Sequence, residues 1–237
     1  IKDFFNLGVT LNNGITLSGG TENSRTYFSY NNTYQTGLIP NNDFRRNNVM
    51  LKEAFSLFDK RVNISTSLNW IHQKTNNAPV VGKALSTLYP LYRTPADIDM
   101  RYFKHNYKHI GTRADNIVSD PEKGNPKLAG QPVQTWYWYD QYLNNPYWVA
   151  NMYNDVQKRD RIMGNITLDA IIWKNIKYQT RFSVDYVLQN NLNEEYAGMN
   201  RVGFDYVGGK YYSSDSRTSD IYNDHMVSYN ERLDDKV

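Results

Sequence analysis

The sequence lacks several features that would narrow its function at once. It contains no cysteine, which excludes a disulfide framework and a cysteine-ligated metal site. No window approaches about 18 consecutive apolar residues, so no transmembrane helix is predicted. No run of lysine and arginine exceeds two residues and the net charge is only +3, which argues against nucleic acid as a partner.

The polarity of the chain comes from amides and phenols more than from charge. Only 22% of the residues are charged, although the mean hydropathy is −0.72, and the sequence holds 29 Asn and 20 Tyr. An aromatic content of 14% argues against disorder. A membrane-spanning β-barrel stays open as a fold class, because its alternating strands average out to a hydrophilic sequence. The chain begins at Ile1 without a signal peptide, and we interpret it as a piece of a longer protein.

The stretch VNISTSLNW, residues 62–70, has two unlike faces at a period of two, which predicts a β-strand. Val62, Ile64, Leu68 and Trp70 lie on one face, and amides and hydroxyls lie on the other. Small uncharged polar groups suit a crowded wet interior better than an open surface. The run that begins at Val62 continues to residue 76, and further strand-like runs occupy residues 13–20, 25–36, 44–58, 159–173 and 176–188.

The longest of these runs exceed the usual strand length. Spans of about 13 to 15 residues are longer than the ~5–6 of globular strands and suit the ~9–11 needed to cross a bilayer, with extensions into solvent. Aromatic residues near both ends of the runs predict membrane-interface girdles, with plain β-propensity as the alternative. These are Phe58, Trp70, Trp173, Tyr178 and Tyr186.

The connections alternate between short and long. Short turns are expected at 21–24, 59–61 and 174–175, and long connections at 37–43, 77–156 and about 190–216. Outer-membrane barrels show this asymmetry, with tight periplasmic turns and long outer loops. The apolar faces are therefore expected to contact lipid and the amide faces to line the lumen. The predicted fold class is all-β, with about seven strands of a large antiparallel transmembrane β-barrel.

At this point the sequence resembles a family. Residues 3–52 resemble the early barrel of the SusC/RagA-type TonB-dependent outer-membrane transporters of Bacteroidetes. The features that carry the resemblance are the Ser-Gly-Gly turn at 18–20, Tyr-Phe-Ser at 27–29, the loop from Gly37 to Asn41 and Phe-Arg-Arg-Asn at 44–47. YRTPADIDM (92–100), NPYW (145–148) and RDRIMGNITLD (159–169) also read like that family.

The resemblance implies a function as well as a fold. The family builds a barrel of about 22 strands, plugged by an N-terminal domain and covered by a SusD-like surface lipoprotein. It implies energised uptake of a bulky nutrient, an oligosaccharide or an oligopeptide, through a plug pulled by a TonB complex. Residues 1–237 then form a barrel segment in the outer membrane, in contact with its lipid, with 77–156 as a long extracellular loop. The plug, the TonB-contacting segment and the other strands are missing.

We therefore expect a transporter and not an enzyme, with no cofactor. Neither a nucleophile-elbow, phosphate-loop nor H-E-x-x-H motif occurs. The competing interpretations are a secreted β-sandwich that binds or hydrolyses glycans, and an outer-membrane barrel with a structural or secretion role. The candidate substrate-binding residues of the lumen are Asn63, Asn69, Asn165, Asp169, Arg181 and Asp185.

Two small groups of potential metal ligands are better explained without a metal. His105 and His109 have the i, i+4 spacing of a helical metal site, but no carboxylate follows closely. Asp97 and Asp99 lie in a proline-initiated turn. We expect neither pair to bind an ion.

The stretch from Gln134 to Trp148 is the richest in aromatic residues. It can pack the long loop against itself, contact a partner protein or stack on substrate, and these alternatives stay open here. The sequence upstream also predicts a short helix from Gly82 to Tyr89 that Pro90 ends. The candidate partner-binding residues, expected to dock the SusD-like lid, are Trp136, Trp138, Tyr139 and Trp148.

Overall fold

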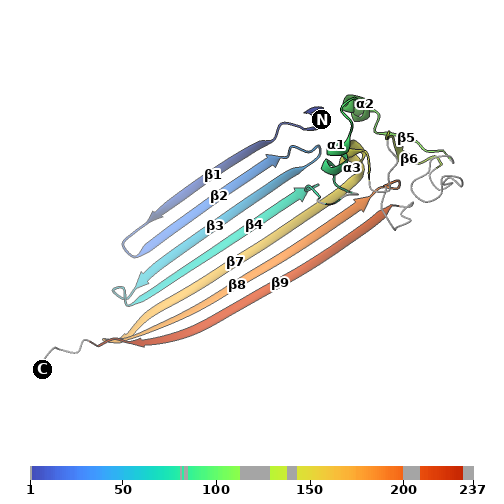
Figure 1. Ribbon diagram of the computed structural model, residues 1–237. Coiled ribbons are helices and arrows are strands. Elements are labelled where there is room, and N and C mark those ends of the chain that lie inside the picture. The colour runs from blue at the N-terminus through green and yellow to red at the C-terminus, as the bar shows by residue number, and fades with distance from the viewer. Residues whose placement is uncertain are drawn as a thin grey trace, which may run out of the picture.

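Seven long strands form one antiparallel sheet in which spatial order follows chain order. The computed structural model describes residues 2–80, 82, 85–112, 129–137, 143–199 and 209–231. The strands run side by side along the whole length of the sheet (Figure 1). They are β1 (Val9–Gly20), β2 (Ser24–Thr36), β3 (Asp43–Leu57), β4 (Val62–Asn76), β7 (Tyr153–Trp173), β8 (Ile176–Glu195) and β9 (Lys210–Tyr229). The predicted all-β class and the count of about seven strands are confirmed.

The remaining elements gather at one end of the sheet, opposite the short turns (Figure 1). They are η1 (Lys2–Phe4), α1 (Leu88–Arg93), α2 (Met100–His105), α3 (Pro146–Met152) and a two-stranded sheet of β5 (Lys108–Ile110) and β6 (Pro132–Gln134). We call this group the loop assembly. No helix in the described part of the chain has the length and apolar character needed to span a membrane.

The alternation of short and long connections is as predicted, but several strands are longer than expected, and β1 begins at Val9 instead of residue 13. β7 begins at Tyr153 instead of residue 159, and β8 continues to Glu195, so the last long connection covers only 196–209. The two strands pair without a break from Tyr153 opposite Glu195 down to Ile171. Near this end most side chains on both faces are polar, with Val156 opposite Leu192 as the exception, so backbone pairing persists where the sequence pattern fades.

The register separates two unlike faces over all seven strands. Residues directly opposite one another share a face, and Ile64 lies opposite both Phe55 and Leu168. The apolar face formed in this way is largely exposed. Its members include Ile15, Leu17, Phe28, Val49, Leu51, Phe55, Ile64, Leu68, Ile162, Ile166, Phe182, Val184 and Ile221. A continuous exposed face of this kind is too large to be an ordinary soluble surface.

The apolar face ends abruptly toward the loop assembly. Tyr30, Trp70 and Tyr186 fall in one register row, meaning residues opposite one another across adjacent strands. The next row is polar over most of its width and includes His72 and Asp160. From Val62 to Trp70 the face extends about 26 Å along the strand, or about 20 Å at a tilt of about 40°. That height is close to the ~25 Å apolar band of outer-membrane barrels.

The buried core lies in the loop assembly and not in the sheet. One cluster contains Phe4, Leu91, Met100, Phe103, Trp136 and Tyr147, and a second contains Trp148, Val149, Tyr153 and Met199. The helix predicted for 82–89 is wrong in its limits: α1 begins at Leu88 and contains Pro90. Proline fits there because the first-turn N–H groups of a helix have no intrahelical acceptor, so Pro90 does not end the helix.

Candidate functional site

All six predicted lumen residues lie on the polar face, opposite to the apolar one. Asn63 of β4 is directly opposite Asp169 of β7, and Asn69 and Asp185 flank Met163 in a single row. Asn165 accepts a hydrogen bond from the Ser67 hydroxyl at 3.0 Å. The structure therefore brings these side chains onto one surface, and their contact with a substrate stays a prediction.

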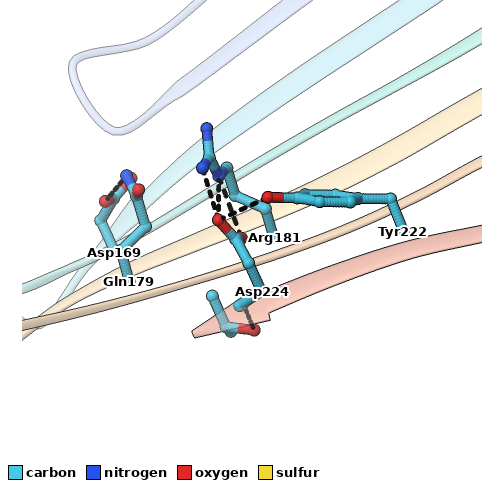
Figure 2. A network of polar contacts seen from close by, with 6 residues as sticks. Asp169, Gln179, Arg181, Tyr222 and Asp224 are labelled. Atoms are coloured by element: carbon cyan, nitrogen blue, oxygen red, sulfur yellow. Dashed lines mark hydrogen bonds and ion pairs between the residues drawn. The ribbon is translucent and has the colours of Figure 1, made fainter. Parts of the chain in front are cut away.

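Charged side chains on the polar face of β7, β8 and β9 are joined in pairs. The Arg161 guanidinium donates to Asp185, with Nε 2.8 Å from Oδ1, and Arg181 donates to Asp224, with Nε 3.0 Å from Oδ1. Figure 2 shows Arg181 and Tyr222 converging on Asp224, where the Tyr222 hydroxyl donates at 3.1 Å. Asp224 is a residue that sequence reasoning missed, because β9 has only a weak apolar alternation.

A second polar contact lies beside this network on the same side of the sheet. The Gln179 amide donates to Asp169 at 2.6 Å, and the two side chains project to the same side as Arg181 (Figure 2). Arg161 was also missed as a site residue. Its pairing with Asp185 depends on the β7–β8 register, which the sequence alone does not reveal.

The polar face carries different charges on its two halves. Within β1–β4 its only charged side chains are the cations Arg25, Arg46 and Lys52, and no carboxylate shares that face. Lys52 lies over the Tyr27 ring, with Nζ 5.7 Å from the ring centroid. Within β7–β9 the face carries both signs of charge. The carboxylates are Asp155, Asp169, Asp185, Glu195, Asp220 and Asp224, and the cations are Arg159, Arg161, Lys177, Arg181 and Lys210.

Two hollows open on the sheet near these charges. The first is lined by Arg25, Tyr27 and Lys52 together with Glu53 and with hydroxyls of β1 and β4. The second is lined by Asn63, Asp169 and Gln179 together with the cations Arg61 and Lys177. Each hollow therefore combines cations with a carboxylate, an arrangement suited to a ligand that carries both signs of charge.

The tryptophans of the aromatic stretch that the structure describes pack inside the loop assembly. Trp148 is 0% exposed and Trp136 is 8% exposed. The Trp136 ring meets the Phe103 ring edge-on at a centroid distance of 4.9 Å. Self-packing, one of the three alternatives, therefore describes these residues, and Trp148 offers no surface to a partner as it is placed. Trp138 and Tyr139 lie outside the described residues.

A buried amide holds three segments of the loop assembly together. Gln134 of β6 donates from Nε2 to Asn144 Oδ1 at 2.9 Å and to the Gly198 carbonyl at 3.0 Å. Its Oε1 accepts from the Asn145 backbone N–H at 2.9 Å. Asn145 in turn caps α3 through the Tyr147 N–H. Burial, with a smaller effect from the Asp3 charge, raises the pKa of Tyr147.

The potential metal ligands have other partners. His105 ends α2 whereas His109 lies on β5, so the two do not share a helical face, and His109 contacts the Thr135 hydroxyl at 3.0 Å. Asp99 caps α2 and pairs with Arg101, and hydrogen bonds from Arg101 lower the pKa of that carboxyl. Among the described residues no three metal-binding side chains come together.

Comparison with known proteins gives a likeness in fold. No protein-family model matches the chain, and no curated protein matches it. A solved structure titled "Structure of the RagAB peptide importer in the 'closed-closed' state" is similar to it, with a TM-score of 0.61 and 14% sequence identity. The match covers 96% of this chain and 23% of that one, so this chain spans less than a quarter of that protein's length. At this identity the likeness concerns the fold alone.

Proposed function

We propose that this chain is part of the wall of an outer-membrane barrel that imports a bulky nutrient. The observation that carries the proposal is the separation of faces. An exposed apolar face, bounded by an aromatic row, lies opposite a polar face lined with amides and ion pairs. Lipid on one side and an aqueous passage on the other would satisfy both faces. The fold shared with a segment of a peptide importer supports this function.

Closure of the barrel requires more strands. β1 and β9 each pair on one side only within the described sheet. In lipid their free N–H and C=O groups would each cost several kcal/mol, so further strands must pair with them. The secreted β-sandwich interpretation is not supported, because no second sheet packs against the long one in the described part of the chain.

The substrate we propose is an oligopeptide. The polar face presents the cations Arg25, Arg46 and Lys52 on β2 and β3. On β7–β9 the carboxylates Asp169 and Asp220 form no ion pair with any residue that the structure describes. These groups complement a ligand with a carboxylate at one end and an ammonium at the other. A neutral oligosaccharide would leave those charges without partners. We further propose that the work is transport rather than chemistry, coupled to TonB through a plug, with a SusD-like lipoprotein over the loop assembly.

Growth of a deletion strain tests this function. We expect loss of growth on an oligopeptide mixture as sole nitrogen source, restored by the full-length gene, with growth on free amino acids intact. Retention of growth on every peptide, with a defect on one oligosaccharide instead, would overturn the peptide assignment. Unchanged growth on all substrates would overturn transport.

The variant pair Asp185→Asn and Asp215→Asn locates the passage. Asp185 lies on the polar face and Asp215 on the opposite one. A charged contact worth about 1.4 kcal/mol corresponds to a tenfold change in affinity. We therefore expect Asp185→Asn to lower peptide uptake about tenfold at limiting substrate and Asp215→Asn to leave it unchanged. Equal effects of the two variants would contradict the assignment of the polar face as the passage.

A further inference from the structure

Three cations lie in line on the outward, apolar side of the sheet, just beyond its aromatic row. Arg45 of β3 is directly opposite Lys74 of β4, which is directly opposite Lys158 of β7. We call these residues the cationic row. Adjacent strands are about 4.8 Å apart, so three positive charges span about 10 Å. Like charges directly opposite one another are destabilising, and the arrangement therefore favours a bound anion.

One cation of the row has a carboxylate partner, because Asp43 lies 3.5 Å from Arg45. Asp160, one row nearer the apolar band, contacts His72 at 2.7 Å and no residue of the row. Asp215, two strands away from Lys158, accepts from Asn190 at 2.6 Å. Lys74 and Lys158 form no ion pair with any residue the structure describes.

The cationic row has the depth of a lipid headgroup layer. Lys74 follows Trp70 by four residues, which is about 13 Å along the strand and about 10 Å along the membrane normal at the usual tilt. The polar layer of a leaflet is about 5–8 Å thick. Lysine stems are long and flexible, so their amines reach back into that layer from just above it.

The cationic row is also confined to one end of the sheet. On the short-turn side of the aromatic row, the apolar face of the seven described strands carries no lysine or arginine. A row placed only for general solubility would have no reason to avoid that end. The asymmetry fits a membrane whose two leaflets differ in charge.

We propose that Arg45, Lys74 and Lys158 bind the phosphate groups of an anionic glycolipid in the outer leaflet. The proposal rests on the membrane placement argued under the proposed function. A bisphosphorylated headgroup would bridge the adjacent cations and remove their mutual repulsion. The Tyr34 ring, whose centroid is 5.0 Å from the Arg45 guanidinium carbon, holds that guanidinium at the edge of the row.

The test compares full-length protein in phosphatidylcholine nanodiscs with and without a bisphosphorylated glycolipid. We expect the wild type to retain the glycolipid on extraction into mild detergent, as counted by native mass spectrometry. We expect the variant Lys74→Gln/Lys158→Gln to bind it about thirtyfold more weakly. The control Lys104→Gln/Lys108→Gln removes the same charge from the loop assembly and should match the wild type.

The remaining arms decide the nature of the ligand. The same glycolipid without its phosphates should not be retained, and inorganic phosphate at equal concentration should not displace the intact one. Equal retention by both double variants, or full displacement by inorganic phosphate, would overturn the proposal. Loss of a co-purifying protein, without loss of glycolipid, in the Lys74→Gln/Lys158→Gln variant would also overturn the proposal.

Two readouts separate this proposal from the proposed function. Heat-modifiable migration on gels shows whether each variant is folded. A variant that folds in nanodiscs and restores normal peptide uptake to the deletion strain separates lipid binding from transport. A wild type that fails to enter nanodiscs would overturn both proposals. A wild type that enters them and retains glycolipid, but imports no peptide, would overturn only the proposed function.

Discussion

Removal of the Gln134 amide should loosen the loop assembly while leaving the long sheet intact. Gln134 is buried and makes three hydrogen bonds to two other segments, through Asn144 and Asn145 and through Gly198. Gln134→Ala leaves a buried N–H and two oxygens without these bonds, and each unsatisfied buried group costs about 1–3 kcal/mol. Allowing for partial relaxation, the loss of local stability should be about 3–5 kcal/mol.

The loss should be local because the strands do not depend on this amide. The sheet is held by its own ladders, which continue without Gln134 from β1 to β9. A local loss of about 3 kcal/mol corresponds to an increase of roughly a hundredfold in amide exchange through local opening. We expect that increase in α3 and at residues 196–199, and wild-type exchange in β3, β4 and β8.

Hydrogen exchange with mass spectrometry on the full-length protein in nanodiscs measures this difference. The control is Gln131→Ala, an exposed glutamine in the same segment. Wild-type exchange of α3 in Gln134→Ala would refute the bridging role. Equal acceleration in the sheet and the loop assembly would refute the independence of the two.

The other predictions concern the turns and one helix cap. A Cβ on Gly20 would lie 2.2 Å from the Ser24 carbonyl oxygen, whereas one on Gly19 meets nothing within 4 Å. Gly20→Ala should therefore lower the free energy of unfolding in urea by about 1–3 kcal/mol, and Gly19→Ala should leave it unchanged. Lys60 has a φ of +66°, a left-handed conformation that glycine adopts more readily than lysine. Lys60→Gly should therefore increase the free energy of unfolding by about 0.5–1 kcal/mol and raise the urea midpoint. A lower midpoint would contradict the left-handed turn. The pKa of Asp99 is lowered from 3.8, so its ionised carboxylate should stabilise α2 from neutral pH down to about 4 and lose that effect below. Amide hydrogen exchange of α2 in the wild type and in Asp99→Asn measures this.

The sequence predicted the strands best where their two faces differ most. The predicted limits of β4, 62–76, agree with the structure, because Val62 to Trp70 alternate between lipid-type and amide side chains. The beginning of β7 was missed, since Asn154 to Lys158 are polar or half-buried on both faces and only pairing with β8 defines them as a strand. A period of two appears in the sequence only where the two faces of a strand meet different environments. Beyond the apolar band, toward the loop assembly, both faces of β7 meet similar environments.

The candidate site was predicted in its parts but not in its pairing. Alternation alone placed Asn63, Asp169 and Asp185 on the polar face, because parity along a strand fixes the face. The partners Arg161 and Asp224 needed the register between strands, which depends on long-range backbone pairing. The burial of Trp148 likewise depends on contacts with Met199 and neighbouring loop residues that no local pattern specifies.

The attachment of the loop assembly to the sheet bears on how the passage would open. The strands extend from the aromatic row at Ile162 to Tyr153, about 30 Å further along β7, before the loop assembly begins. There the two are joined by amide hydrogen bonds: Asn41 Nδ2, in the connection between β2 and β3, donates to the Ala150 carbonyl of α3 at 2.9 Å and to Asn151 Oδ1 at 3.0 Å.

These bonds make the loop assembly a continuation of the wall and not a hinged flap. α3 follows directly into β7, so tilting the helix would bend the longest strand of the sheet. Closure of the outer end by this segment would therefore have to break the two Asn41 contacts with α3. A separate lid resting on the loop assembly needs no such break, which is the physical argument for the surface lipoprotein in the proposed function.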